Sequence, residues 1–325
     1  GVNSLTNNST GNNNVSVGYQ SLFCNTVSNN TAVGFCALRS NTVGTSNVSV
    51  GSYNLINNTS GDSNTSVGFT AMQANTIGRR NTALGAQALR CNVSGCYNTA
   101  LGDYALRNNT AGANTAVGYE SLRANTTGTS NTAVGKDALK CNTVGGVNTA
   151  IGSSALFRNI SGTLNVAVGV AALQCNQVGN YNVGVGVNSN RSNTGGFSNT
   201  AIGYRTLYNN LASNNTAVGM QSLRDNTTGT CNTAVGVNAL CSNTTGLKNT
   251  AVGFCAGASI STNYGLTAVG YLAARLSTSR NNTAIGWGSS CCLTTGCSNT
   301  TLGALALRQS TTGQENVAVG YYALG

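Results

Sequence analysis

The chain has 325 residues and a net charge of +10, with 16 Lys and Arg against 6 Asp and Glu. Charged residues make up 7% of it, against about 25% in an ordinary globular domain, and 40% is hydrophobic, which excludes a disordered chain. There is no His, which excludes Ser-His and Cys-His nucleophile pairs, so we expect no enzyme and no cofactor. No run of about 20 apolar residues predicts a membrane span.

One repeat accounts for the whole chain. Its unit reads Asn-Thr-Ala-Val-Gly-Tyr-x-Ala-Leu-x-x-Asn-Thr-Thr-Gly-x-x, and we number its positions one to seventeen. The units start at residues 14, 30, 47, 64, 81, 98, 114, 131, 148, 165, 182, 199, 215, 232, 249, 266, 282, 299 and 316, after a truncated unit at residues 1–13. Four of the eighteen steps are 16 residues long instead of 17. Residues 1–325 are therefore predicted to form a single repeat array.

The repeat predicts an all-β fold. Thr-Ala-Val before a Gly corner is typical of a short strand, Tyr-x-Ala-Leu predicts a second β segment, and Asn-Thr-Thr-Gly predicts a turn. We expect a parallel β-solenoid, a β-roll or β-helix, of about twenty coils of 16–17 residues with equivalent side chains stacked about 4.8 Å apart.

Two positions are nearly invariant. Position five is Gly in all nineteen units, as in Gly34, Gly85, Gly135 and Gly236, which predicts a structural corner with a positive φ or a close backbone approach. Position one is Asn in eighteen units. Stacked Asn side chains can form a hydrogen-bonded ladder, although Asn also tolerates corner geometry, so both interpretations stay open.

The core phrase of the repeat is found in a known family. Asn131-Thr132-Ala133-Val134-Gly135 and Asn282-Thr283-Ala284-Ile285-Gly286 resemble the head repeats of trimeric autotransporter adhesins and similar arrays in phage and viral tail-fibre proteins. The resemblance implies a left-handed parallel β-roll, three chains around a threefold axis and a surface that binds host ligands. The coils here are longer than those of the adhesin heads.

Charged side chains recur at fixed positions. Position ten is basic in nine units, and four consecutive coils carry Arg90, Arg107, Arg123 and Lys140. This stripe can bind a polyanion or simply form a solubilising edge. Glu120 and Asp137 share position seven of successive coils. They can act as an acid/base pair, hold a cation, or form a solvated edge balanced by Lys136 and nearby Arg residues.

Cysteines and aromatic residues also follow the repeat. Cys91 and Cys96, like Cys292 and Cys297, occupy positions eleven and sixteen of one coil, which predicts either a corner disulfide or two free thiols. We predict no metal site. Twelve cysteines favour an extracellular, cell-surface or virion-surface location. Aromatic residues recur at position six, where they either pack or stack on sugars.

These features favour a structural fibre or adhesin-like protein that presents a repetitive face. Its expected partners are further copies of the chain, as a homotrimer or an axial filament, and anionic glycans or a surface receptor. Nucleic acid is not an expected partner, because aromatic residues do not cluster with the charge. One alternative is ice binding by the Thr columns at positions two and thirteen. A second alternative is a glycan-cleaving tailspike that uses carboxylates on a solenoid.

Overall fold

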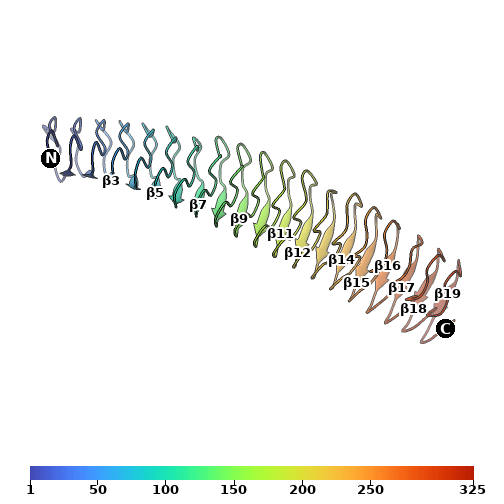
Figure 1. Cartoon of the computed structure of the whole chain (residues 1–325). Helices are drawn as coiled ribbons and strands as arrows, with labels where there is room; N and C mark the ends of the chain where they lie inside the picture. Colours follow the sequence, from blue (N-terminus) through green and yellow to red (C-terminus); the bar gives the residue numbers. More distant parts are fainter. The chain divides into compact units, whose positions relative to one another are not determined.

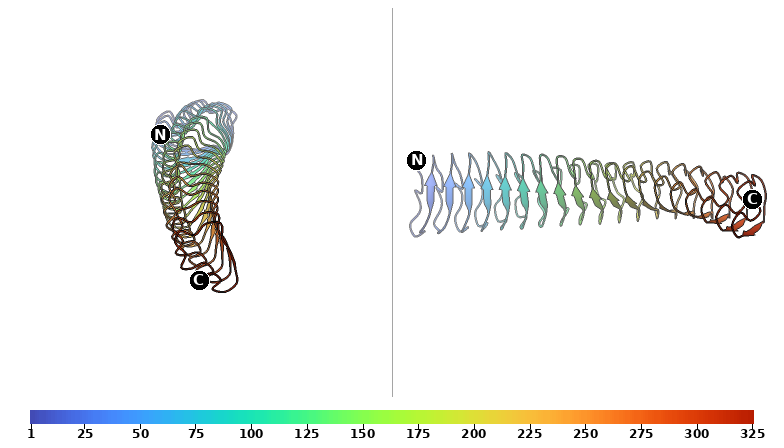
Figure 2. Two further views of the ribbon diagram at one scale, coloured as in Figure 1. Left: turned by 90° about the vertical axis from the view of Figure 1, so that its right-hand side faces the viewer. Right: turned by 90° about the horizontal axis from the view of Figure 1, so that it is seen from below.

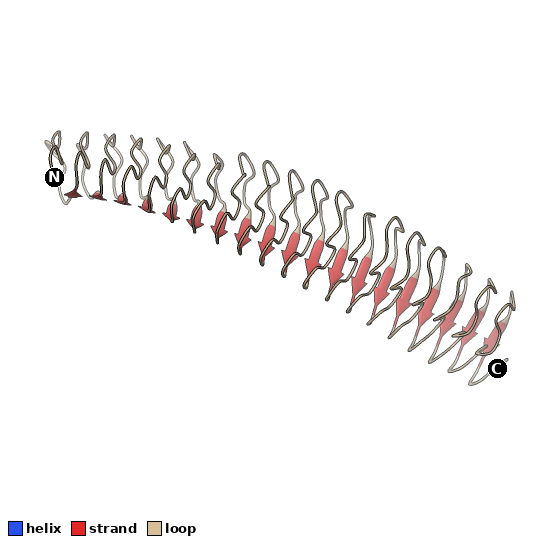
Figure 3. Ribbon diagram, in the orientation of Figure 1, coloured by secondary structure: helices blue, strands red, loops and turns tan.

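A computed structural model describes all residues from Gly1 to Gly325 and shows a β-solenoid without helices. Each coil contributes one three-residue strand, and all nineteen strands are parallel. Figures 1 and 3 show the strands of each unit stacked in the same direction. This confirms the predicted fold class. The chain divides into two compact units, Gly1–Leu164 and Asn165–Gly325.

The strands occupy positions two to four of each repeat. The first unit contains β1 (Val15–Val17), β2 (Thr31–Val33), β3 (Val48–Val50), β4 (Thr65–Val67), β5 (Thr82–Leu84), β6 (Thr99–Leu101), β7 (Thr115–Val117), β8 (Thr132–Val134) and β9 (Thr149–Ile151). The second unit contains β10 (Val166–Val168), β11 (Val183–Val185), β12 (Thr200–Ile202), β13 (Thr216–Val218), β14 (Thr233–Val235), β15 (Thr250–Val252), β16 (Thr267–Val269), β17 (Thr283–Ile285), β18 (Thr300–Leu302) and β19 (Val317–Val319).

Within each unit the register is that of the repeat. In the first unit, Thr132 of β8 pairs with Thr149 of β9, and Ala133 pairs with Ala150. Figure 2 shows these strands side by side along one face, all pointing the same way. Because side chains alternate along a strand, Ala133 is buried while Thr132 and Val134 point outward and stay partly exposed.

The predicted second β segment is wrong. Residues at positions seven and nine adopt a left-handed backbone conformation, with φ of 57° at Gln87 and 51° at Leu89, so Tyr-x-Ala-Leu forms turns. The backbone nevertheless bonds to neighbouring coils. The Leu89 N–H donates to the carbonyl of Ala105 at 3.0 Å, and the Gln87 N–H donates to that of Phe69 at 2.9 Å. The alternating turns thus satisfy the backbone without an extended strand.

The core is a narrow apolar column between two columns of Asn. Ala at positions three and eight and Leu at position nine are fully buried in most coils, as Ala133, Ala138 and Leu139 illustrate. Burying one Leu side chain contributes about 1.5–3 kcal/mol to folding. No coil contains more than a few such residues, so stability depends on stacking neighbours, as in other repeat proteins.

The Asn ladder at position one is confirmed. The side chain of Asn47 accepts hydrogen bonds at its Oδ1 from the backbone N–H of Asn64 at 3.0 Å and from Asn64 Nδ2 at 3.1 Å. Asn64 Nδ2 also donates to the carbonyl of Gly78 at 2.9 Å. The same contacts recur in the second unit, where Asn232 Nδ2 donates to Asn215 Oδ1 at 3.2 Å. These buried amides are hydrogen-bonded along the coil axis, which removes the cost of burying them.

A second ladder, which the sequence interpretation missed, runs along position twelve. Asn75 Nδ2 donates to Asn58 Oδ1 at 2.7 Å and to the carbonyl of Gly78 at 3.0 Å. The carbonyl of Gly78 at position fifteen therefore accepts from both ladders. The recurrence of Asn at positions one and twelve and of Gly at position fifteen could have predicted this second ladder.

The Gly corners are confirmed. Gly34, Gly85, Gly135 and Gly236 have φ between 130° and 139°, a region that other residues rarely adopt. The backbones of successive corners are also in close contact. A Cβ added to Gly85 would lie 2.6 Å from the carbonyl carbon of Gly102 in the next coil. The corner requires Gly for both its conformation and its packing.

The 16-residue coils lack position fourteen. In a full coil, Asn81 Nδ2 bonds to the carbonyl fourteen residues later, that of Gly95. In the short coil that follows, Asn98 Nδ2 bonds to the carbonyl thirteen residues later, that of Ala111. The position-one ladder is therefore preserved in the short coils, and the Asn-Thr-Thr-Gly turn is one residue shorter.

Candidate functional site

The outer face of the sheet is a repeated surface with exposed apolar side chains. It presents the Thr or Val of position two beside the Val, Ile or Leu of position four in every coil. Position-four side chains stay substantially exposed, at 50% for Leu84 and 41% for Ile151 in the first unit and 48% for Leu302 in the second. No Thr hydroxyl at position two makes a side-chain hydrogen bond within the chain, so this face offers apolar groups and free hydroxyls in register.

Aromatic side chains border this face at position six. Tyr19 and Phe35 stack with their ring centroids 5.2 Å apart, and Phe254 and Tyr271 stack at 5.3 Å. All four rings remain between 41% and 46% exposed. These rings therefore pack along the coil axis, as one of the two interpretations held, while staying partly exposed.

The predicted basic stripe is divided into two pairs. Arg90 Nε donates to Gln73 Oε1 at 3.0 Å, and Arg107 Nε donates to Gln87 Oε1 at 2.9 Å, so both guanidiniums bond to neutral amides. The other two members, Arg123 and Lys140, are held by carboxylates. Only the half of the stripe around Arg90 and Arg107 lacks ion pairs, and its role in polyanion binding stays a prediction.

The two stacked carboxylates are held by basic side chains. Lys140 lies between them, paired with Glu120 and with Asp137 Oδ1 at 3.2 Å, and Arg123 Nη1 lies 2.9 Å from Glu120 Oε1. Burial alone would raise the pKa of Glu120, but the hydrogen bond and charge of Lys140 lower it overall. The hydrogen bond from Lys140 to Glu120 in turn raises the pKa of Lys140.

This geometry is that of a charge-balanced edge. The balancing lysine is Lys140, and the expected Lys136 forms no ion pair. The Lys140 ammonium occupies the place between the carboxylates where a cation or a shared proton would lie. Nowhere do three or more His, Cys, Asp or Glu side chains gather in a set able to hold a metal ion.

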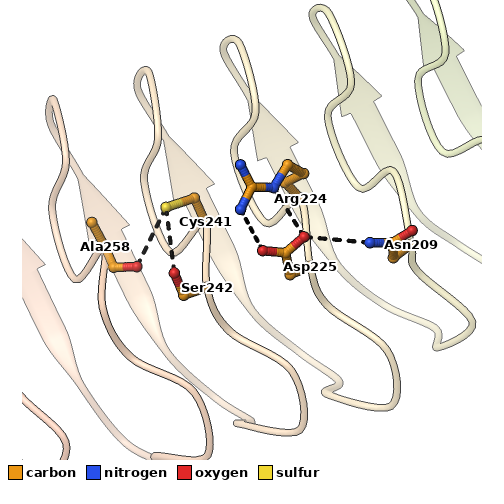
Figure 4. Close-up of polar contacts among 6 residues, drawn as sticks. All are labelled: Asn209, Arg224, Asp225, Cys241, Ser242 and Ala258. Carbon is orange, nitrogen blue, oxygen red and sulfur yellow. Dashed lines mark hydrogen bonds and ion pairs between the residues drawn. The ribbon is translucent and has the colours of Figure 1, made fainter.

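In the second unit, polar contacts at positions ten and eleven run from coil to coil. Figure 4 shows Arg224 forming a two-pronged contact with Asp225, with Nε 2.9 Å from Oδ1. Asp225 also accepts from Asn209 Nδ2 of the preceding coil at 3.3 Å. The thiol of Cys241 donates to the carbonyl of Ala258 in the next coil at 3.4 Å. These contacts join adjacent coils at the edge.

All twelve cysteines are free thiols in the structure. Cys96 Sγ contacts the carbonyl of Ser94 and the N–H of Arg79, both at 3.4 Å, and Cys91 Sγ lies 4.0 Å from Asn108 Oδ1. Cys297 Sγ contacts Gln314 Oε1 at 3.6 Å, and Cys292 Sγ lies 3.4 Å from the Sγ of its neighbour Cys291. The corner disulfides Cys91–Cys96 and Cys292–Cys297 stay predictions.

Several of these thiols are poor nucleophiles. Burial raises the pKa of Cys141, Cys255 and Cys291. A raised pKa keeps a thiol protonated at neutral pH, and the thiolate is the reactive form.

The chain matches no protein-family model, and a search of curated proteins finds no significant match. The structure shows a repeat β-solenoid, and the resemblance to adhesin heads and tail fibres rests on the Asn-Thr-Ala-Val-Gly phrase. No helix in the structure has the length and apolar character needed to cross a bilayer.

Proposed function

We propose that the chain is a non-enzymatic structural protein, a fibre or adhesin-like component of a virion or cell surface. Its outer sheet face serves assembly or attachment. The observation that carries this proposal is that every coil presents a partly exposed Val, Ile or Leu at position four beside a Thr or Val at position two, in register. A monomeric soluble protein rarely exposes a contiguous apolar surface of this kind, because water disfavours it.

The partner that best fits this face is a second copy of the chain. A second copy carries side chains at the same period, so its columns can match column by column over many coils. Stable interfaces bury about 800 Å² on each partner, which a repeated face supplies by adding coils. Matching of the sheet faces fits a homotrimer. An axial filament, which would join chains end to end through their terminal coils, is the second assembly we propose, and anionic glycans or a surface receptor are the proposed external ligands.

Charged substitutions on the sheet face test the self-association. The double substitution Leu84→Lys and Ile151→Lys puts two ammonium groups on this face while leaving the inward Ala column intact. We expect it to raise the dissociation constant of the oligomer at least about 100-fold, because two apolar contacts per copy are lost and like charges then face each other. Sedimentation velocity over a concentration series measures this.

A matched control is available at position fourteen. Ile77 and Val144 are 51% and 53% exposed, but they lie outside the strands. Ile77→Lys with Val144→Lys adds the same charge and should leave the dissociation constant within about threefold. A native protein that stays monomeric at every concentration, or equal effects of the two double variants, would contradict assembly through the sheet.

Ice binding is a second candidate, favoured by the free hydroxyls of the position-two Thr column. Position thirteen contributes less than expected, because its hydroxyls are used inside the chain. Thr76 Oγ1, for example, donates to the carbonyl of Val93 at 3.1 Å. If the position-two column binds ice, the purified protein will show thermal hysteresis that Thr132→Lys and Thr149→Lys together reduce. An absence of hysteresis at millimolar protein would rule this function out.

A further inference from the structure

One hollow in the second unit breaks the repeat. It has a volume of about 420 Å³ and opens on the turns of three successive coils, at positions thirteen to sixteen, away from the sheet. Its volume falls in the range of about 300–1,000 Å³ that is typical of small-molecule sites. The residues that line it include Thr262, Tyr264, Thr278, Ser279, Arg280 and Thr295.

The charge of Arg280 at the hollow is unpaired. Arg280 Nη1 donates to the hydroxyl of Tyr264 at 2.8 Å, and its guanidinium lies 5.8 Å from the centre of that ring. It forms no ion pair, unlike Arg123 and Arg224 elsewhere in the chain, and no carboxylate lines the hollow. A guanidinium has five N–H donors in a planar fork, so most of them remain available to an anionic oxygen.

Backbone amides beside Arg280 are also unpaired. In the preceding coil the N–H groups of Thr244, Thr245 and Gly246 all donate to the carbonyl of Ser261. The N–H groups of Thr262 and Asn263 have no such partner, because the coil that starts at Leu266 is one residue short in this turn. Consecutive free amides of this kind are ready donors to an anion.

The turn amides of the first unit also lack their hydrogen bonds in the coil before the short coil that starts at Asn98. There the N–H groups of Ser94 and Gly95 make no backbone hydrogen bond. The free amides thus follow from the deletion of position fourteen. The hollow places the cation of Arg280 and the ring of Tyr264 beside these amides. It also has free hydroxyls, because neither Thr262 nor Thr295 uses its hydroxyl inside the chain.

We propose that this hollow binds an anionic saccharide, a sugar ring that carries a carboxylate or a sulfate. Arg280 and the amides of Thr262 and Asn263 receive the anionic group, the hydroxyls of Thr262 and Thr295 bond to the sugar hydroxyls, and the 41%-exposed ring of Tyr264 lies under the sugar face. An inorganic anion alone would leave the ring and the hydroxyls without partners. The site does not depend on self-association of the sheet face.

Titration of the full-length protein with glucuronate tests this proposal. Amide chemical shifts report on Thr262 and Asn263 directly, and we expect them to move with glucuronate, with glucose binding at least about tenfold more weakly because it lacks the charge. Arg280→Gln should weaken glucuronate binding about tenfold or more. Arg280→Lys keeps the charge but loses the fork, so its effect should lie between those of native Arg and Gln.

The matched control is Arg80→Gln. Arg80 Nη1 donates to the Tyr97 hydroxyl at 3.1 Å in the same kind of pair, but this pair lines no such hollow. It should leave glucuronate binding within about twofold. The proposal is overturned if the shifts at Thr262 and Asn263 are absent, or if Arg280→Gln leaves the glucuronate concentration that gives half of the shift unchanged. Inorganic sulfate binding as tightly as glucuronate would mean an adventitious ion only and would overturn the saccharide assignment.

Discussion

The variant Gly236→Ala will lose at least about 4 kcal/mol of stability, a large cost for the addition of one methyl group. Two effects combine in it. The φ of 133° is a conformation that Ala rarely adopts. A Cβ at this position would also lie 2.4 Å from the carbonyl oxygen of Gly253 in the next coil, so the two coils must separate. Chemical denaturation measures the loss, and faster amide exchange at Gly253 locates it.

Gly195→Ala is the matched control in the same unit. The only atom near the added methyl is Val178 Cγ2, at 3.4 Å, which is ordinary van der Waals contact. This variant should change stability by no more than about 0.5 kcal/mol. If Gly236→Ala were as stable as Gly195→Ala, the corner could not be the close backbone contact described above.

Much of the fold was predictable because stacking places each residue next to the residue at the same repeat position of the neighbouring coils. Gly at position five was interpreted correctly on that ground, since it needs a special backbone conformation. For Asn at position one, the ladder that the structure shows was one of the two interpretations given. The second β segment was wrong. Leu89 and Gln87 have positive φ, and nothing in the propensities of Leu or Gln indicates it. The tertiary ladder imposes that conformation.

The candidate site was harder to predict. The basic column at position ten was identified from the sequence. The sequence did not indicate that Arg107 bonds to the amide of Gln87 while Lys140 bonds to the carboxylates of Glu120 and Asp137. Those pairings depend on which way long side chains turn between coils. The hollow near Arg280 depends on a one-residue deletion whose effect on backbone amides appears only in three dimensions.

A second large effect is expected at one of the coils that depart from the repeat inside the core. At position nine, where most coils have Leu, this coil has Gly257. Gly257→Leu restores the usual residue, yet we expect it to cost about 3 kcal/mol through overpacking. A Cβ at Gly257 would lie 2.9 Å from Ile260 Cδ1 and 3.1 Å from Leu266 Cδ2, and both of those side chains replace ladder Asn residues. Urea denaturation of the full chain measures this loss.

The residues at positions 257, 260 and 266 therefore compensate one another, because apolar side chains replace two ladder Asn residues where the core lacks its usual Leu. Ile260 and Leu266 fill the space that Leu would take, and the exchange leaves Asn243 Oδ1 buried without a hydrogen-bond partner. Adding Ile260→Asn and Leu266→Asn to Gly257→Leu should recover stability to within about 1 kcal/mol of the native chain, since the side-chain amide introduced at position 260 would then donate to Asn243. The two Asn substitutions without Leu at position 257 should cost about 2–5 kcal/mol, because they leave a cavity. Strictly additive free energies across this cycle would mean that the three positions do not compensate one another, and that the ladder and the apolar column are independent.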